Sequence, residues 1–495
     1  MKTQLTLIIK RLITNTCYRI GKWGKIFFIW LYKKLRYSIY MHAAYIGAIL
    51  TLAFAPFDFP LAIPVALSGF LLFLDKKAST CLRAGALGWW FGFGYAITSL
   101  YWIGNALFAR LDDFWWLLPV AYVGIPIVVA FYFIPPAIAV YYCRKPLFKP
   151  FAFTFVWVFM EYIRSNFFIP FPWNLLGYSL AATDVTVQSA YYLGIYGGSI
   201  VLGLFGTLFY LRKMWAYTAG GLIAVIIVMV GVIRLHYANV EYHDITVRLV
   251  QPNPPEHHLG DAAKSARLLT RLVELSVLQL SPDVKHIIWP EASFPHLIAD
   301  NSRYLKSIAQ LVPKDGTIIF GADRMEQILI TKRYYNSIFV VDSHAKVLAY
   351  YDKESLVPFG EYIPFRKVLP FIETFAYSVG EFSVGTNASK NLTADSLPPF
   401  MPLICFEVIF PNLLRGAERP EWFLAITNDS WYGDTPGPYQ HLAMAKFRAA
   451  QYGVPMIRVA NTGISAVISP YGQIIKKLDL NVTGYIDHKL PKRLT

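Results

Sequence analysis

The chain has 495 residues, of which 55% are hydrophobic and only 16% are charged, and its formal net charge is +15. This balance excludes an ordinary soluble protein, in which about a quarter of the residues carry a charge, and it is typical of a membrane protein. The positive charge would suit nucleic-acid binding, but the basic residues fall between hydrophobic segments, as they do in cytoplasmic loops of membrane proteins. We therefore expect a membrane as partner and no nucleic acid.

The first forty residues, 1–40, form a basic arm that contains no acidic residue. Its apolar run Ile26–Leu31 is too short to cross a bilayer, and no small-residue cleavage site follows it. We interpret the arm as a cytoplasmic helix that lies in the membrane interface, and not as a cleaved signal peptide.

Residues 41–235 are dominated by long uncharged stretches, which predict a transmembrane bundle of about seven helices. The predicted segments cover residues 41–57, 59–74, 84–108, 114–143, 150–163, 185–210 and 215–235. Two of these segments are short for a full span of about 20 residues. The bundle either anchors a soluble domain or shapes a lipid-facing substrate site, and the sequence leaves both interpretations open.

The positions of Lys and Arg predict which side of the membrane each loop faces, because cytoplasmic loops are enriched in these residues. The basic arm and alternate loops carry most of the positive charge. The loop residues are Lys76, Lys77, Arg83, Arg144, Lys145, Lys149, Arg212 and Lys213. The opposite loops hold Arg110 and Arg164 among several acidic residues. We therefore expect a cytoplasmic N-terminus and, after seven crossings, a soluble domain of residues 241–495 on the far side.

Residues 241–495 have the pattern of an α/β domain, because short runs of Val, Ile, Phe and Tyr alternate with helical or loop segments. The predicted strands are Ile245–Gln251, Lys285–Trp289, Thr317–Phe320, Tyr335–Val341, Val347–Tyr351, Met401–Ile404, Trp422–Ile426, Met456–Val459 and Ser465–Ser469. The segment Tyr439–Tyr452 predicts a helix that ends at Gly453 and Pro455. Polar side chains at the ends of buried strands are where α/β enzymes gather their chemistry.

Three such polar residues follow predicted strands: Glu291, Lys353 and Cys405. Cys405 is the single cysteine of residues 241–495, so it cannot form a disulfide within that domain. A thiol nucleophile needs a base and a group that stabilises the developing oxyanion. A glutamate behind an apolar strand has a raised pKa that suits a general base, and a lysine supplies positive charge. Taken alone, each residue also fits a structural role. Cys405 could be a small buried side chain, Glu291 an acid in the first turn of a helix, and Lys353 a solvated residue at a strand end.

His441 is a second candidate for the base. It lies in the predicted helix near Arg448, and the spacing does not exclude a Cys405–His441 pair. No metal-binding pattern is present, since the sequence has no paired metal-motif cysteines, no HExxH motif and only scattered histidines. A Gly-rich phosphate loop and a nucleotide fingerprint are also absent from the sequence. We expect neither a metal nor another cofactor.

Several ordered motifs resemble those of a known family. WPEAS (Trp289–Ser293), YDKESLVPFGEYIP (Tyr351–Pro364) and CFEVIFP (Cys405–Pro411) are similar to motifs of the nitrilase superfamily, and more specifically to those of bacterial apolipoprotein N-acyltransferases. TNDSWYGDTPGPYQH and RVANTGISAVISPYGQI extend the likeness, and so do the hydrophobic segments. The resemblance covers nearly the whole chain from about residue 41.

The resemblance implies a multi-helix membrane bundle joined to a nitrilase-type αββα sandwich, with Glu291, Lys353 and Cys405 as a catalytic triad. Such enzymes move an acyl chain from a phospholipid, typically phosphatidylethanolamine, to the cysteine as a thioester. They then transfer it to the α-amino group of a diacylglyceryl-modified N-terminal cysteine of a lipoprotein. This implies a multi-pass protein of the bacterial inner membrane with a periplasmic catalytic domain. The alternative is a membrane-tethered amidase that hydrolyses a small C–N bond with the same triad.

Further residues match family positions near the triad. Glu361 is similar to a second essential glutamate, which positions the lysine or relays a proton, and Glu407 is similar to an acid two residues after the nucleophile. Phe406 stands where the family more often has tyrosine, and its backbone donor is expected to be retained. Asn336 and Trp431 match positions that bind substrate.

The chain departs from the family pattern in two further places. Gly260 stands where a tryptophan usually follows the QPN motif (Gln251–Asn253), so the resemblance does not assign that substrate contact here. The sequence ends at LPKRLT, where the family normally continues into a last transmembrane helix. We expect a missing helix to remove one membrane anchor and to lower activity, and the sequence leaves truncation and natural loss of the helix both open.

Overall fold

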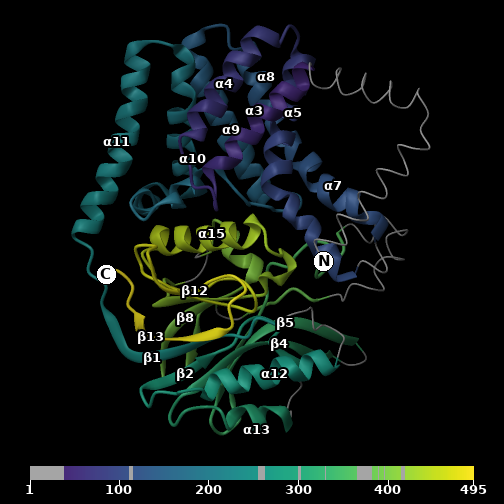
Figure 1. Ribbon diagram of the computed structural model, residues 1–495, viewed down its shortest axis with the longest axis vertical. Helices are drawn as coiled ribbons and strands as arrows, with labels where there is room; N and C mark the ends of the chain where they lie inside the picture. Colours follow the sequence, from purple (N-terminus) through teal and green to yellow (C-terminus); the bar gives the residue numbers. More distant parts are fainter. Residues whose placement is uncertain are drawn as a thin grey trace.

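The computed structural model describes residues 38–110, 115–254, 262–298, 303–328, 331–364, 382–387, 390–394, 396–413 and 418–495. The predicted basic arm up to residue 37, and also Gly260, lie outside these ranges. Figure 1 shows a helical bundle at the top, β-sheets below it, and helix α15 (Pro436–Tyr452) between the two. The first half of the chain forms the bundle and the second half forms the sheets.

Every predicted hydrophobic segment contains a helix. The helices are α3 (Ile39–Leu50), α4 (Ala62–Lys77), α5 (Cys81–Leu100), α7 (Leu118–Ala130), α8 (Ile134–Tyr142), α9 (Lys149–Asn166), α10 (Ala190–Leu208) and α11 (Met214–His236). Three helical stretches of the described residues, Trp115–Tyr142, Thr186–Leu211 and Met214–His236, are long and apolar enough to cross a membrane. Length and composition do not decide how often the shorter helices cross, so the number of crossings stays a prediction.

Close packing of α3 against α5 explains why glycines recur in the bundle. A Cβ atom added to Gly47 would lie 1.9 Å from the carbonyl oxygen of Phe91, and one added to Gly94 would lie 1.9 Å from that of Ala44. Only glycine lets the two backbones approach so closely, as small residues do in membrane helix pairs. Phe70 of α4 stacks on Phe91 with ring centroids 4.2 Å apart. Aromatic side chains thus fill the space around the closely packed pair.

The second half of the chain contains two mixed β-sheets, with strand orders β13-β1-β2-β4-β5-β6, where β3 also pairs with β4, and β12-β11-β10-β9-β8-β7. The strands of the first sheet are β1 (Tyr242–Gln251), β2 (Val284–Ile288), β3 (Phe294–Ile298), β4 (Thr317–Ile328), β5 (Thr331–Asp342), β6 (Val347–Asp352) and β13 (Gly484–Pro491). Those of the second sheet are β7 (Leu392–Ala394), β8 (Leu397–Ile404), β9 (Trp422–Thr427), β10 (Met456–Ala460), β11 (Ser465–Ile468) and β12 (Ile474–Leu478). β2 is parallel to β4, and both β4 and β6 are antiparallel to β5. The carboxyl ends of β2 and β6 therefore lie at the same edge of the first sheet.

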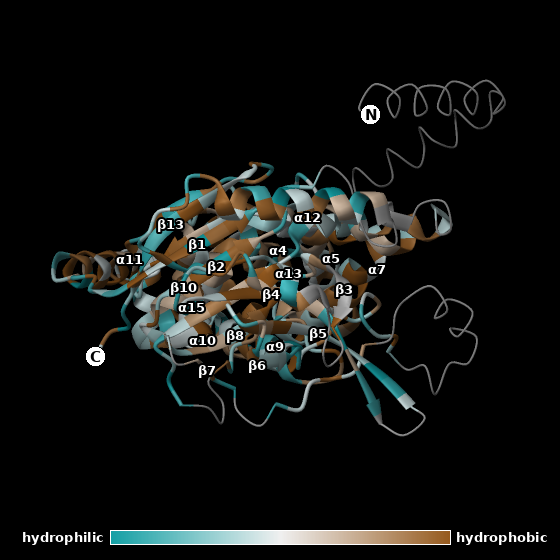
Figure 2. Ribbon diagram, turned by 90° about the horizontal axis from the view of Figure 1, so that it is seen from below, coloured by the Kyte–Doolittle hydropathy of each residue, from teal (hydrophilic) through white to brown (hydrophobic). Residues whose placement is uncertain are grey.

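The two sheets pack face to face around a shared apolar core, in which Val247 of the first sheet and Leu424 of the second are fully buried. Helices α12 (Ala262–Val277) and α13 (Arg303–Ala309) cover the other face of the first sheet, and α15 covers the other face of the second. Along α12, hydrophilic and hydrophobic residues mix (Figure 2), as expected for a helix with one face on a sheet. These αββα layers confirm the predicted fold class.

All the predicted strands are present, and all of them except the edge strand β6 are largely buried. The prediction missed β3, β7, β12 and β13. β12 contains Lys476 and Lys477 at one edge of the second sheet, and β13 contains Asp487 and Lys489 at one edge of the first. Edge strands keep polar and charged residues, so they lack the continuous apolar runs by which the buried strands were recognised.

Helix α15 connects the sheets to the bundle. The side-chain oxygen of Gln440 accepts hydrogen bonds from Trp102 Nε1 at 3.2 Å and from Trp173 Nε1 at 2.8 Å. Both tryptophans belong to the first half of the chain. The same helix packs against the short 3₁₀-helix η10 (Cys405–Ile409). One helix therefore contacts both the bundle and the segment that holds the predicted nucleophile.

Candidate active site

The three predicted triad residues lie at strand ends that the two sheets bring together. Glu291 follows β2 and Lys353 follows β6 at one edge of the first sheet, and Cys405 directly follows β8 of the second. Lys353 Nζ lies 3.6 Å from Glu291 Oε1, and the charges of both residues act on the Cys405 thiol. All three side chains are buried. The structure thus places a carboxyl group, a cation and a thiol in one buried cluster.

Glu361 and Asn336 belong to the same cluster. Lys353 Nζ donates a hydrogen bond to Glu361 Oε1 at 2.8 Å. The side-chain amide of Asn336, on β5, donates to Glu291 Oε1 at 2.8 Å and to Glu361 Oε1 at 3.0 Å. Glu361 Oε2 accepts from the backbone N–H of Val357 at 2.7 Å. Two residues that the sequence suggested only by resemblance therefore contact Glu291 or Lys353 directly.

Glu291 is also oriented by the second sheet. Its Oε2 accepts a hydrogen bond at 2.8 Å from the backbone N–H of Asn428, which follows β9. Its backbone carbonyl accepts one at 2.6 Å from the side chain of Asn461, which follows β10. Sequence reasoning did not single out these two asparagines, although both stand in quoted motifs. With Asn336 on Oε1, both carboxyl oxygens have a fixed donor.

The backbone at Cys405 makes a sharp turn between β8 and η10. Its φ of +49° lies in the left-handed region, which costs a residue with a Cβ atom about 1–2 kcal/mol. Surrounding contacts must therefore hold the turn. One of them joins the carbonyl oxygen of Cys405 to His441 Nε2 at 3.1 Å. The turn presents the thiol at the carboxyl end of the strand.

His441 faces the backbone of Cys405 and not its sulfur. Its other ring nitrogen, Nδ1, lies 3.0 Å from Asp429 Oδ1, and Arg458 Nη2 donates to Asp429 Oδ2 at 2.6 Å. Burial raises the pKa of Asp429, but the charges of Arg458 and His441 outweigh it and hold that pKa well below its usual value. Because both ring nitrogens already have partners, the geometry does not support His441 as the base for the thiol.

Burial controls the ionisation of the cluster. It raises the pKa of Glu291, an effect that Lys353 opposes and Glu361 reinforces. Burial also raises the pKa of the Cys405 thiol to about 12, with Glu291 adding to the rise and Lys353 opposing it. Burial lowers the pKa of Lys353, but the charges of Glu361 and Glu291 outweigh it and raise that pKa above its usual value. At neutral pH the lysine is charged and the thiol keeps its proton, so a base must form the thiolate.

Aromatic residues surround the thiol on the side of the bundle. Phe406 stacks on Phe171, with ring centroids 6.3 Å apart. The hydroxyl oxygen of Tyr432 lies 3.9 Å from Cys405 Sγ. The predicted site residue Trp431 is half-buried in the short helix η11 (Asp429–Trp431). Tyr432 was missed because two adjacent aromatic residues carry no sequence signal that tells which ring reaches the sulfur.

Comparisons with known proteins identify the family. Residues 46–208 match the family model of the apolipoprotein N-acyltransferase N-terminal domain, and residues 246–494 match that of carbon-nitrogen hydrolases. The chain is 35% identical over 476 residues to an apolipoprotein N-acyltransferase of Rhodopseudomonas palustris, covering 90% of this chain and 88% of the relative. It is 36% identical over 465 residues to one of Rickettsia bellii, covering 91% of each. The chain belongs to the apolipoprotein N-acyltransferase family.

Solved nitrilase-superfamily structures resemble part of this chain at low sequence identity. An amidase from Nesterenkonia has a TM-score of 0.36 and 18% identity, covering 51% of this chain and 92% of the amidase. Nit3 of Saccharomyces cerevisiae has a TM-score of 0.37 and 20% identity, covering 50% of this chain and 89% of Nit3. The fold class rests instead on the observed αββα layers and on the family models.

Glu407 braces the turn at Cys405. Its two carboxyl oxygens accept four hydrogen bonds. The donors are the backbone N–H groups of Ile404 (2.8 Å), Glu354 (2.8 Å) and Ser355 (3.1 Å) and the hydroxyl of Tyr351 (3.0 Å). Burial raises the pKa of Glu407 to about 7, although the N–H donors oppose the rise. Glu407 thus ties the segment after Lys353 to the turn that holds Cys405.

Replacing Glu407 by glutamine is expected to destabilise the protein by about 1–3 kcal/mol, because the new amide nitrogen would leave buried N–H donors without an acceptor. Thermal unfolding of the full chain in detergent measures the effect as a lower midpoint. The matched control is Glu421→Gln, since Glu421 is part of a more exposed ion pair with Arg493. That change is expected to cost less than about 1 kcal/mol. Equal midpoints for the two variants would contradict the bracing role.

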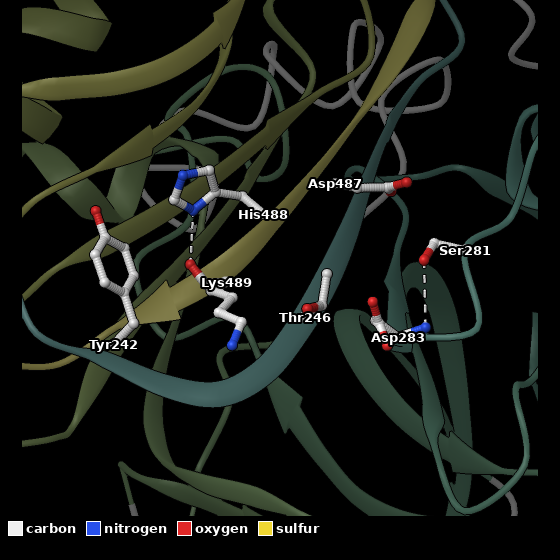
Figure 3. A pocket seen from close by; sticks show the side chains of 7 residues that line it. All are labelled: Tyr242, Thr246, Ser281, Asp283, Asp487, His488 and Lys489. Carbon is white, nitrogen blue, oxygen red and sulfur yellow. Dashed lines mark hydrogen bonds between the residues drawn. The ribbon is translucent and has the colours of Figure 1, made fainter.

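A surface cavity of about 410 Å³ lies apart from this cluster, beside β1 and β13 (Figure 3). Its lining residues are Tyr242, Thr246, Ser281, Asp283, Asp487, His488 and Lys489. The predicted site residues are not among them. Asp487 forms an ion pair with Arg248, and Lys489 forms one with Asp244. These charged side chains therefore have structural partners. We assign the candidate active site to the cluster at Cys405 and not to this cavity.

Proposed function

We propose that this chain acylates lipoproteins through a thioester on Cys405. The donor is a membrane phospholipid, with phosphatidylethanolamine as the expected head group, and the acceptor is the N-terminal α-amino group of a diacylglyceryl-modified cysteine. One observation carries the proposal: Lys353 is buried between Glu291 and Glu361 beside a buried thiol. The names of the relatives support the same reaction.

In the first half-reaction, Glu291 takes the proton of the Cys405 thiol, and the sulfur attacks the ester carbonyl of the phospholipid. Lys353, held by Glu361, and the backbone N–H of Phe406 stabilise the oxyanion of the tetrahedral intermediate. The ester C–O bond then breaks, and the leaving oxygen takes the proton from Glu291. A lysophospholipid departs, and the acyl chain remains on Cys405 as a thioester.

In the second half-reaction, the α-amino group of the acceptor attacks the thioester carbonyl and gives a proton to Glu291. Lys353 again stabilises the oxyanion. The C–S bond breaks, the Cys405 sulfur recovers its proton from Glu291, and the acceptor leaves as an amide. Splitting the transfer in this way replaces one difficult step by two easier ones.

The membrane half is proposed to cross the bacterial inner membrane several times, with a cytoplasmic N-terminus and a periplasmic catalytic domain. The three long apolar stretches support a membrane location, and the basic loops support this orientation. Rings of the first half also approach the nucleophile: Phe171 stacks on Phe406, and the Trp102 ring lies 4.6 Å from that of Tyr432. These contacts favour a bundle that shapes the acyl site over one that only anchors the enzyme.

The test is mass spectrometry of the purified full chain in bilayers that contain phosphatidylethanolamine. We expect a mass increase of one acyl chain, located on the peptide that holds Cys405. A diacylated lipopeptide with a free N-terminal amine should discharge this adduct and gain the acyl mass. The same lipopeptide with an acetylated N-terminus is the matched control, and it should leave the adduct in place.

Other outcomes have distinct meanings. Release of the adduct to water at one rate with either lipopeptide would reject the transferase and favour a hydrolase. Hydrolysis of small amides without any acyl adduct would favour the membrane-tethered amidase. Equal adduct formation from phosphatidylglycerol would reject the preference for phosphatidylethanolamine and leave the transfer itself standing.

A further inference from the structure

The hydroxyl of Tyr432 is placed against the sulfur of the nucleophile. Its oxygen lies 3.9 Å from Cys405 Sγ. The ring is held from several sides, with centroids 4.6 Å from Trp102, 5.9 Å from Trp173 and 5.9 Å from His441. These contacts come from the bundle and from α15. They fix the ring so that its polar end faces the thiol.

The hydroxyl of Tyr432 has a hydrogen to give to this sulfur. The Thr427 hydroxyl also lowers the pKa of the Cys405 thiol through a hydrogen bond, but Asp429 Oδ1 competes for its single hydrogen at 2.7 Å. Burial raises the pKa of Tyr432 well above its usual value, and the charges of Cys405 and Asp429 add to the rise. The phenol therefore keeps its proton at neutral pH and remains a donor.

We propose that Tyr432 is a catalytic residue whose hydroxyl donates a hydrogen bond to the Cys405 thiolate. The inference rests on the function proposed above, in which the thiolate attacks in the first half-reaction and leaves in the second. No bond of Tyr432 is broken in either step, because Glu291 carries the proton. The distance of 3.9 Å belongs to the neutral thiol. Hydrogen bonds to ionised acceptors are shorter and stronger, and catalytic contacts tighten when the reacting complex forms.

The size of the effect follows from the strength of one charge-assisted hydrogen bond. Such a bond changes the acid dissociation constant of the thiol by about ten- to a hundredfold. A weaker acid also gives a more nucleophilic thiolate, and this cancels roughly half of the effect on the logarithm of the rate. Removing the hydroxyl should therefore slow alkylation of Cys405 about three- to tenfold at any pH where the thiol is mostly protonated.

The test uses Tyr432→Phe, which removes one oxygen and keeps the ring that packs on the bundle. The full chain in detergent with phospholipid is treated with iodoacetamide between pH 7 and 9. Mass spectrometry of the peptide that holds Cys405 separates its reaction from those of Cys17, Cys81 and Cys143. We expect three- to tenfold slower alkylation at each pH. In acyl transfer, kcat should fall while KM for the lipopeptide stays unchanged.

The matched control is Tyr439→Phe, which removes a hydroxyl from an exposed ring at the start of α15. Its alkylation rate should equal that of the wild type. Equal or faster alkylation in Tyr432→Phe would overturn the inference. An equal rate is the result for a ring that only fills space, and a faster rate is the result for a substitution that loosens the site. Slower alkylation in a protein that forms no acyl adduct would support the contact with the thiol and reject the proposed function. The two claims can thus fail separately.

Discussion

Replacing Lys353 by methionine is expected to lower the rate of acyl transfer by at least about a thousandfold. Methionine fills nearly the same volume but removes the charge between Glu291 and Glu361, whose oxygens lie 3.6 and 2.8 Å from Nζ. Loss of one oxyanion donor alone costs about 10²–10³ in rate. Without the lysine the two buried carboxylates also repel each other, so the pKa of Glu291 rises further and this base is more often protonated. Single-turnover formation of the acyl adduct measures the effect, and Cys405→Ala, which cannot form the adduct, gives the background rate.

Lys353→Arg separates the charge from its geometry. Arginine keeps the charge, but its planar guanidinium cannot take the place of a compact ammonium between two carboxylates. We expect it to restore less than about a tenth of the lost rate. Removal of one partner from a buried ion pair also destabilises a protein, by about 3–5 kcal/mol, so the rates are compared well below each variant's unfolding temperature. Adduct formation by Lys353→Met within tenfold of the wild-type rate would exclude the lysine from the chemistry.

The main site residues could be predicted because their signal is local. Glu291, Lys353 and Cys405 each follow a run of apolar residues, and a polar group at a strand end points to a site. The pairing of the strands is not local. The carboxyl ends of β2 and β6 lie at the same end of the sheet only because β4 and β5 pair between them. The sequence could therefore suggest the residues of the cluster, while their contacts required the fold.

Residues that support the cluster were harder to predict. The spacing of Cys405 and His441 allowed a Cys–His pair, and only the structure shows Asp429 on one ring nitrogen and the backbone of Cys405 facing the other. Tyr432 reaches a sulfur 27 residues away along the chain. Contacts of this kind depend on how β8, β9 and α15 pack, and single residue types do not encode them.

The bundle illustrates a different limit. Hydrophobic runs predicted the helices, because apolar length is a strong signal. The run 114–143 was predicted as one segment and forms one helical stretch, Trp115–Tyr142, in which the short 3₁₀ turn Phe131–Phe133 joins α7 to α8. Pro135 and Pro136 stand in the first turn of α8, where proline is tolerated because its missing N–H has no helical partner. Hydrophobicity alone does not report such a local change of helix type.

Two consecutive residues of α15 link the bundle to the nucleophile. Gln440 accepts hydrogen bonds from Trp102 and Trp173, and the next residue, His441, contacts the carbonyl oxygen of Cys405. A helix turn is a stiff connection, so a shift of the tryptophans would reach the strained turn at Cys405 directly. This link gives a physical reason for the bundle and the nitrilase-type domain to act as one enzyme.

Replacing Glu291 by glutamine is expected to slow acyl transfer at neutral pH by about 10²–10⁴-fold, the usual contribution of a general base. In the wild type the rate should rise with pH through the pKa of Glu291, which burial raises, because only the ionised carboxylate accepts the thiol proton. Above that pKa the rate should reach a plateau. In Glu291→Gln the thiol must ionise unaided, and burial still raises its pKa although the contribution of the Glu291 charge is lost. The rate should then rise tenfold per pH unit between pH 7 and 9, without a plateau.

Glu291→Asp is the matched control, since a shorter side chain keeps the carboxylate but moves it away from the donors Asn336 and Asn428. It should lose rate and still keep the plateau. The pH–rate profile of adduct formation distinguishes the two variants even where both are slow. A plateau that persists in Glu291→Gln would mean that another group takes the proton. Asp323 is then the first residue to replace, because burial and the charge of Glu361 still raise its pKa in this variant, and a raised pKa suits a base near neutral pH.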